Sequence, residues 1–149
     1  MIDTLREWFL PNILDKKFTY TINSYGNAER RYEYYNFLRK DIPFDKEFNE
    51  YLVTLTKDTN FTYQVYHIHK WKEGYFFNEH IDDRANRKFA YVCELKESEC
   101  KTKLLVENKP LEEGYFGVTT KHRVPVIKSG ERISLTVFGS NIIERKEVI

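Results

Sequence analysis

The chain has 149 residues, of which 41% are hydrophobic, 32% charged and 16% aromatic. This length and composition predict one globular domain with a substantial core, and they exclude a disordered or fibrous chain. The net charge of +1 provides no broad attraction for nucleic acid or for an anionic membrane, and no apolar run is long enough to span a bilayer, so we expect neither as a partner.

The two cysteines and the first residues indicate a reducing compartment. Pairing Cys93 with Cys100 would close only a small loop, and disulfide frameworks usually contain more cysteines, so we expect reduced thiols. The residues from Met1 to Trp8 carry charges where a signal peptide would need its apolar run. The expected compartment is therefore the cytoplasm.

The first elements expected along the chain are a short helix and a strand. Residues 3–10 can form a helix with Asp3 as its cap and with Pro11 as its end. Residues 18–22 alternate in the manner of a strand and lead into a turn cluster at 23–26. These elements are expected to support the strand-rich region that follows rather than to form part of it.

Two further segments precede the region of regular alternation. Residues 28–40 are rich in Arg and Tyr and fit either a helix or a polar strand; we assign them to a helix. Asp45 can cap a second helix, with apolar residues at helical spacing up to about Lys57. This helix should pack on the outside of a sheet.

From Phe61 the apolar period changes to two, and turn signals separate a run of short strands. Such spacing is typical of a double-sheet jelly roll, here a mainly β, cupin-like double-stranded β-helix at 61–140, with residues 1–60 supplying supporting helices and a strand. The tail at 144–149 is expected to be a loose end or a last helical turn. The predicted strands are 61–71, 75–81, 88–95, 102–107, 114–119, 122–127 and 131–138.

The alternation of side chains in the last predicted strand indicates which of its faces lines a pocket. Even-numbered residues from Arg132 to Phe138 share one face, which is polar at its start, and odd-numbered residues from Ile133 to Val137 form an apolar opposite face. The polar face is expected to line a pocket, and the apolar face to meet the helices.

Three side chains suggest a metal site. His80 and Asp82 are two apart, so in an extended segment they point the same way, about 6.6 Å apart along the strand. His122 offers a second imidazole forty positions later. Two histidines and one carboxylate on one side of an ion form the facial set that leaves positions open on non-haem Fe(II).

Arg132 follows His122 by ten residues, and its planar fork of donors suits a carboxylate. Together with the metal set it completes a pattern that is more specific than any of its parts. From Tyr63 to Phe138, about half of the chain, the sequence resembles the 2-oxoglutarate and Fe(II)-dependent dioxygenases, and most of all the prolyl 4-hydroxylase-like group. The segments that carry the resemblance are Trp71–Asp82, Arg87–Leu95, His122–Val126 and Ser129–Leu135.

The resemblance implies an activity and a set of roles. It implies a dioxygenase that hydroxylates a protein or peptide side chain, with proline as the analogous target, and that releases succinate and CO2. Fe(II) would be the metal, with His80, Asp82 and His122 as its ligands. 2-Oxoglutarate would be the cosubstrate, held through its distal carboxylate by Arg132 with Ser134 as a second donor. O2 would be consumed, with ascorbate as a supporting reductant.

Four further residues are candidates for the substrate pocket. Trp71 and Phe77 stand where relatives usually have tyrosines beside the iron, so they form either an aromatic substrate wall or ordinary core. His67 and His69 lie on the strand face that continues to Trp71, where they either line the substrate entrance or are satisfied strand histidines.

Two alternatives remain open. His67, His69 and Glu73 have the spacing of a cupin metal motif, which would add His122 as a fourth ligand. That alternative ranks second, because the glycine expected before the motif is absent and Arg132 has no role in it. The other alternative is a non-catalytic binding module that keeps the barrel.

The sequence departs from the resembled family around the cosubstrate. The pair of glycines that relatives commonly carry is missing from 101–105, which suggests a narrower approach. Where many relatives place a tyrosine that contacts the cosubstrate, this chain has Glu94, a poor companion for a carboxylate. Either the register slips, so that Cys93 or Leu95 points inward, or Glu94 is turned outward.

Overall fold

The computed structural model of the chain describes residues 1–96 and 100–142. Its strands and helices follow one another with the short loops typical of a compact domain. In chain order they are α1 (Ile2–Asn12), β1 (Thr19–Tyr25), β2 (Ala28–Leu38), the 3-10 turn η1 (Arg39–Asp41), α2 (Asp45–Thr56), β3 (Val65–Trp71), β4 (Phe76–His80), β5 (Arg87–Glu94), β6 (Leu105–Val106), β7 (Lys109–Pro110), β8 (Glu113–Gly117), β9 (His122–Val124) and β10 (Arg132–Ser140).

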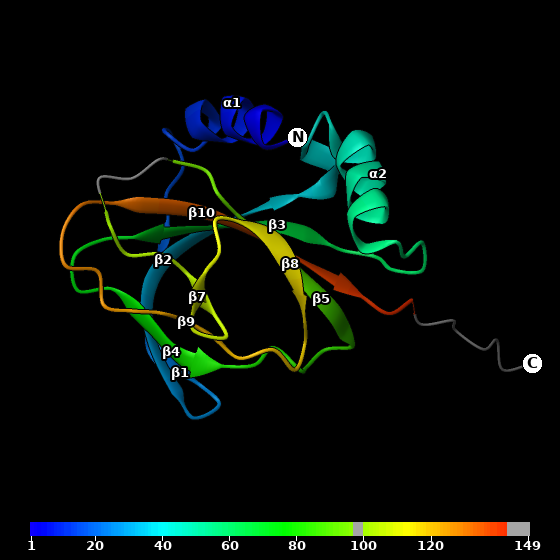
Figure 1. Cartoon of the computed structure of the whole chain (residues 1–149). Coiled ribbons are helices and arrows are strands. Elements are labelled where there is room, and N and C mark those ends of the chain that lie inside the picture. The colour runs from blue at the N-terminus through cyan, green and yellow to red at the C-terminus, as the bar shows by residue number, and fades with distance from the viewer. Residues whose placement is uncertain (97–99, 143–149) are drawn as a thin grey trace, which may run out of the picture.

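The strands form one antiparallel sheet of ten strands in the order β7-β6-β9-β4-β2-β3-β10-β5-β8, with β1 paired to β2. The sheet curls, so that the strands β4 and β9 turn away from the layer that carries β10 and β5 (Figure 1). The predicted jelly-roll fold, the double-stranded β-helix, is confirmed. The strand β2, from the N-terminal part of the chain, lies in the middle of the sheet between β4 and β3.

Both helices cover one face of this sheet (Figure 1). Their apolar residues pack with the side chains of β3, β5 and β10 that point toward them, in a core that contains Phe9 and Phe48 at 0% exposure. Ile133, Leu135 and Val137 belong to this core. The predicted parity of the last strand is therefore confirmed, and the opposite face of β10 is left to line the interior of the barrel.

A second core lies on the inner side of the barrel. It includes Tyr32, Trp71, Phe116 and Val124, which come from the strands β2, β3, β8 and β9. Aromatic side chains such as these bury large apolar areas and keep fixed orientations. This second core forms the floor on which the candidate site lies.

The predicted helices exist, but their ends differ from expectation. The helix α1 runs one residue past Pro11, and Met1 rather than Asp3 is its N-cap. The helix α2 begins at Asp45 with Phe44 as N-cap. The Asp45 carboxylate does not cap the helix, because it accepts hydrogen bonds from Arg39, Tyr63 and Tyr66 instead.

The helix predicted at 28–40 is wrong, because residues Ala28–Leu38 form the strand β2. This strand pairs with β1 in a hairpin closed at Tyr25 and Ala28, and also with β3 and β4. Arg and Tyr tolerate both conformations, so hydrogen bonds to three neighbouring strands decide the outcome.

The seven strands predicted after Phe61 all occur, five of them in shorter form. The first begins at Val65 rather than at Phe61, and the segment at 102–107 contributes only two residues to β6. A two-residue strand, β7, was not predicted; it pairs with β6 across a turn in which Glu107 and Asn108 have positive φ. The end or helical turn predicted at 144–149 lies outside the described residues.

Close packing explains why position 139, in β10, is occupied by glycine, and this explanation can be tested. A Cβ atom at this position would overlap the ring of Phe89 on the neighbouring strand β5. We expect Gly139→Ala to lower the free energy of unfolding by about 1–3 kcal/mol, since overpacked cores force side chains out of their rotamers. Urea unfolding measures the change.

Gly117 provides the matched control, because it also pairs with Phe89 but a Cβ there would meet nothing within 4 Å. Gly117→Ala should leave stability nearly unchanged. Equal losses for the two variants would contradict the packing explanation.

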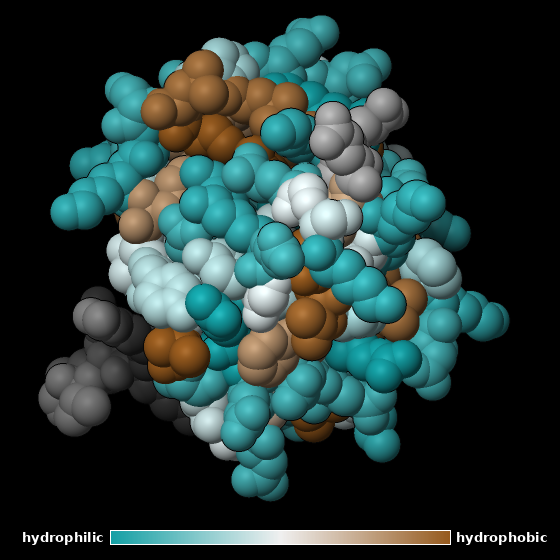
Figure 2. All heavy atoms as spheres, turned by 90° about the vertical axis from the view of Figure 1, so that its left-hand side faces the viewer, coloured by the Kyte–Doolittle hydropathy of each residue, from teal (hydrophilic) through white to brown (hydrophobic). Residues whose placement is uncertain are grey.

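No helix in the described part of the chain is long and apolar enough to cross a lipid bilayer. Polar side chains dominate the face of the molecule shown in Figure 2, and apolar atoms appear there in separate patches, the largest at the top, the end where the helices lie. Single apolar patches of this kind are usual on a folded domain.

Candidate metal centre and cosubstrate site

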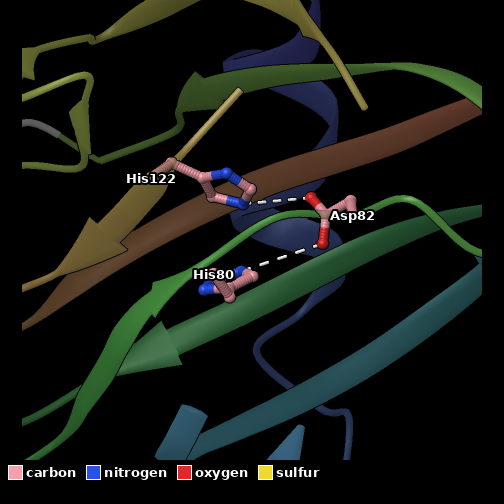
Figure 3. Close-up of side chains that lie close together, drawn as sticks. All are labelled: His80, Asp82 and His122. Carbon is pink, nitrogen blue, oxygen red and sulfur yellow. Dashed lines mark ion pairs between the residues drawn. The ribbon is translucent and has the colours of Figure 1, made fainter. Parts of the chain in front are cut away.

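The candidate metal centre lies where the strands β4 and β9 meet. His80 is the last residue of β4 and His122 the first residue of β9, and the two are directly paired in register. Asp82 follows two residues after His80, and its backbone N–H donates to the Val118 carbonyl at 3.1 Å. Strand pairing and this backbone bond therefore bring together side chains that are 40 positions apart, and Figure 3 shows them pointing toward one another.

The ligand atoms of these three residues all lie within 4.8 Å of one another. The Asp82 carboxylate lies between the imidazoles, 3.0 Å from Nε2 of His122 and 3.7 Å from Nε2 of His80 (Figure 3). The two imidazole rings have centroids 4.1 Å apart. The three residues predicted as a metal set are thus brought together, on one side of a common centre.

The second nitrogen of each imidazole has a backbone partner. Nδ1 of His80 is 2.7 Å from the Asn78 carbonyl, and Nδ1 of His122 is 3.0 Å from the Thr120 carbonyl. A carbonyl can only accept, so each Nδ1 carries the proton and each Nε2 directs its lone pair at the centre. Such bonds commonly fix the tautomer and orientation of metal-binding histidines.

Burial sets the charges of the centre. Burial, and then the neighbouring His122, lower the pKa of His80 from 6.5 to about 4, so this imidazole is neutral at physiological pH. Burial is the largest influence on the Asp82 carboxyl and would raise its pKa, but the neighbouring His122, His80 and Arg87 together outweigh burial and hold that pKa below its usual value. A neutral imidazole and an ionised carboxylate are the forms that bind a metal.

The residues therefore fit an Fe(II) ion in type and arrangement. Two imidazole nitrogens and one carboxylate oxygen on one side of an ion form the facial set of non-haem Fe(II) oxygenases. The three side chains line a cavity of about 440 Å³ between the layers of the barrel. Positions on the metal not taken by the protein would face this cavity.

The four predicted pocket residues lie in the walls of the same cavity: His67, His69, Trp71 and Phe77. Phe77 stacks on His80 with ring centroids 3.6 Å apart. The rings of His67 and His69 stack on each other at 6.3 Å, and Nδ1 of His67 contacts Oδ1 of Asn36 at 2.9 Å. Trp71 belongs to the buried core and also forms part of the cavity wall.

The cupin ligand set is not assembled. Among the described residues, only His80, Asp82 and His122 form a group of three that could hold a metal ion. Glu73 is exposed in the turn after β3, whereas His67 and His69 point into the cavity. His122 instead lies with His80 and Asp82.

Arg132 begins β10 and is buried at 3% exposure, with its side chain in the cavity wall. Burial lowers the pKa of its guanidinium from the usual value, although the nearby Glu94 carboxylate opposes that shift. Its Nε atom is buried without a hydrogen-bond partner, an arrangement that has a free-energy cost unless a ligand supplies an acceptor. Ser134 lies two residues on, and its Oγ accepts a hydrogen bond from Nε1 of Trp71 at 3.1 Å.

The position of Glu94 in the structure contradicts both predicted alternatives, a slipped register and an outward orientation. Glu94 pairs in register with Ser134, is 3% exposed and has one carboxylate oxygen 3.6 Å from Nε of Arg132, so it points to the cosubstrate side and is not turned outward. Cys93 and Leu95 instead belong to the core beneath the helices. Lys103, which the sequence did not single out, donates to the other Glu94 oxygen at 2.9 Å.

Comparisons with known proteins agree with this architecture at the level of fold. No model of a protein family matches the sequence, and no curated protein does. A prolyl-4-hydroxylase structure from Pseudomonas putida superposes with a TM-score of 0.72 at 14% identity, covering 96% of this chain and 89% of that one.

Two other solved structures are similar. An oxidoreductase of the 2OG-Fe(II) oxygenase family from Burkholderia pseudomallei has a TM-score of 0.57 at 14% identity, covering 91% and 80% of the two chains. A viral collagen prolyl hydroxylase from Paramecium Bursaria Chlorella virus-1, in complex with 2OG, has a TM-score of 0.61 at 16% identity, covering 75% and 80%. The chain has the fold of these hydroxylases.

The pocket histidines predict a dependence of stability on pH. Burial lowers the pKa of His69 from 6.5 to about 3 and that of His67 to about 4. Below about pH 6.5 the unfolded chain therefore binds protons that the folded protein does not. We expect the unfolding free energy of the metal-free protein to fall between pH 7 and pH 5, by at most about 1.4 kcal/mol per pH unit for each histidine.

Urea unfolding at several pH values measures this dependence. His69→Gln removes one titrating group and should therefore show a smaller loss of stability between pH 7 and pH 5 than the parent protein. The same loss in both proteins would show that His69 is not held neutral by the fold.

Proposed function

We propose that this protein is an Fe(II)- and 2-oxoglutarate-dependent dioxygenase that hydroxylates a protein or peptide side chain, with proline as the leading candidate. The observation that carries the proposal is the convergence of His80, Asp82 and His122 within 4.8 Å, at the wall of a cavity that also contains Arg132. The fold shared with prolyl hydroxylases and with a 2OG-Fe(II) oxygenase supports the same chemistry.

The residues of the chain would divide the work of binding. His80 and His122 would hold iron through Nε2, and Asp82 through a carboxylate oxygen. Bound iron and 2-oxoglutarate would supply the oxidising chemistry, in which dioxygen is consumed, 2-oxoglutarate is converted to succinate and CO2, and one oxygen atom enters a substrate C–H bond. The protein contributes ligation, orientation and exclusion of water.

Arg132 would bind the distal carboxylate of 2-oxoglutarate. A buried carboxylate without a partner costs several kcal/mol, so a cationic donor is needed at this depth in the barrel. The buried Nε of Arg132 lacks a hydrogen-bond partner and can donate to such an oxygen. Ser134 accepts from Trp71, which leaves its own hydroxyl proton available for the same carboxylate.

The aromatic wall would hold the substrate against the metal. Phe77 stacks on His80, and Trp71 donates to Ser134, so both side chains are fixed by contacts with the proposed iron and cosubstrate residues. Proline is proposed as the target because two of the similar structures are named as prolyl hydroxylases. Ascorbate would act as a supporting reductant by keeping iron in the ferrous state.

Uncoupled turnover tests the proposal without a known substrate. Purified protein is incubated with Fe(II), 2-oxoglutarate and ascorbate in air, and succinate is measured. The parent protein should form succinate, and His80→Ala should not. A parent protein that binds Fe(II) but forms no succinate, with or without candidate peptides, would overturn the proposal.

Glu73→Ala serves as the control, because Glu73 belongs to the cupin spacing and is exposed in the structure. It should form succinate at the rate of the parent protein. If it lost metal while His80→Ala kept metal, the cupin alternative would replace the dioxygenase.

A further inference from the structure

We infer that the substrate of this site is an acidic peptide, recognised by three arginines grouped around Tyr25 in the cavity wall. The arginine cluster consists of Arg30, Arg84 and Arg87. Arg30 lies in β2, Arg84 in the loop that follows β4, and Arg87 at the start of β5. The inference rests on the proposed function for the identity of the site. It adds the chemistry of the substrate residues that flank the reacting one.

Tyr25 is the centre of this cluster. The Arg84 guanidinium carbon lies 4.0 Å from the centroid of the Tyr25 ring, and that of Arg30 lies 5.1 Å away. Nη1 of Arg87 donates to the Tyr25 hydroxyl at 3.1 Å. Cation–π contacts of this kind fix guanidinium groups while leaving their other N–H donors available.

The cluster borders the proposed metal centre directly. The rings of Tyr25 and His80 have centroids 5.5 Å apart, and Arg30 also lies over the ring of Phe77, which stacks on His80. A substrate residue placed at the metal would therefore have its neighbours in the chain beside these guanidinium groups.

The charges of the cavity are strongly unbalanced. Among the described lining residues, Asp82 is the one carboxylate, whereas the three arginines of the cluster and Arg132 are four cationic side chains. No carboxylate in the described part of the chain forms an ion pair with Arg30, Arg84 or Arg87. Three positive charges then face the space left for the substrate, and an anionic partner is favoured there.

Two observations favour carboxylate side chains over nucleic acid. The net charge of the chain is only +1, which gives a long phosphate backbone no broad electrostatic attraction beyond the cavity. The cavity of about 440 Å³ also has the size of a pocket for a small group of side chains. Arginine and carboxylate match in planar, two-pronged geometry.

The test is direct binding of two capped, fluorescein-labelled pentapeptides to metal-free protein, measured by fluorescence anisotropy. One peptide has the sequence Gly-Glu-Pro-Glu-Gly, and the other has glutamine in place of both glutamates. We expect the acidic peptide to bind at least about tenfold more tightly, because hydrogen bonds from arginine to a carboxylate are stronger than those to a neutral amide. Added salt should reduce the difference.

Arg30→Gln and Arg87→Gln should each remove most of the preference for the acidic peptide. Arg31→Gln is the matched control, because Arg31 is adjacent to Arg30 but donates to the Tyr20 hydroxyl and does not line the cavity. It should retain the full preference, which separates the cavity charges from a general loss of positive charge.

Equal binding of the two peptides, or binding of neither, would overturn the inference. So would a stronger competition by inorganic phosphate or by a single-stranded oligonucleotide than by the acidic peptide. This measurement involves neither metal nor turnover, so it is independent of the proposed chemistry. If the protein preferred the acidic peptide but formed no succinate, the acidic-peptide site would stand and the dioxygenase proposal would fail.

Discussion

Asp82→Ala is expected to lower the affinity for Fe(II) by at least about 100-fold and to abolish succinate formation. Loss of a residue that only orients a metal ligand costs 10- to 100-fold, and loss of a ligand itself should cost more. The carboxylate lies between the two imidazoles, 3.0 Å and 3.7 Å from their Nε2 atoms, so no other described side chain can replace it. Anaerobic titration with Fe(II) measures the affinity.

Asp83→Ala is the matched control, because Asp83 is the next residue and is exposed. It should bind Fe(II) as the parent protein does. Circular dichroism of metal-free Asp82→Ala should match that of the parent, since the two cores are built from apolar side chains. Unchanged metal binding, or gross unfolding of the variant, would contradict the assignment of Asp82 as a ligand.

Arg132→Gln is expected to weaken the binding of 2-oxoglutarate by about 30- to 5,000-fold. Removing one partner of a buried, hydrogen-bonded charge pair costs about 2–5 kcal/mol, which corresponds to that range. Calorimetry under anaerobic conditions, with Mn(II) in place of Fe(II), measures the affinity without turnover. Retention of tight binding would show that another group holds the distal carboxylate.

Glu94→Gln is the companion variant and should have the opposite effect. The Glu94 carboxylate lies 3.6 Å from Nε of Arg132 and would repel the carboxylate of the cosubstrate, so its neutralisation should tighten binding by roughly tenfold. Glu112→Gln is the control, because Glu112 also pairs with Lys103, at 3.2 Å, but is largely exposed. Weaker binding in Glu94→Gln would instead assign Glu94 to positioning Arg132.

The candidate metal set could be proposed from the sequence because its signal lies in residue types and short spacings. His80 and Asp82 are two apart near the end of a strand, and Arg132 follows His122 by ten residues. The parity of β10 was predictable for the same reason, since alternate residues of a strand face opposite sides. In the structure, strand pairing adds the one fact that spacing cannot supply, which is the register of His80 with His122.

Other features depend on contacts that a single segment does not reveal. The strand β2 was mistaken for a helix, because its state is decided by pairing with β1, β3 and β4. The inward position of Glu94 follows from its register with Ser134, and its charge is paired with Lys103, nine residues later in a loop without periodicity. The arginine cluster draws on three separate segments, and no pattern within any one of them marks it.

The most direct test of the metal and cosubstrate site is a crystal structure of the protein grown with Mn(II) and 2-oxoglutarate without oxygen, with anomalous scattering recorded for the metal. We predict one anomalous peak bonded to His80, Asp82 and His122, with the distal carboxylate of 2-oxoglutarate on Arg132. A metal bound by His67 and His69, or a metal at the predicted centre with the dicarboxylate away from Arg132, would contradict the account.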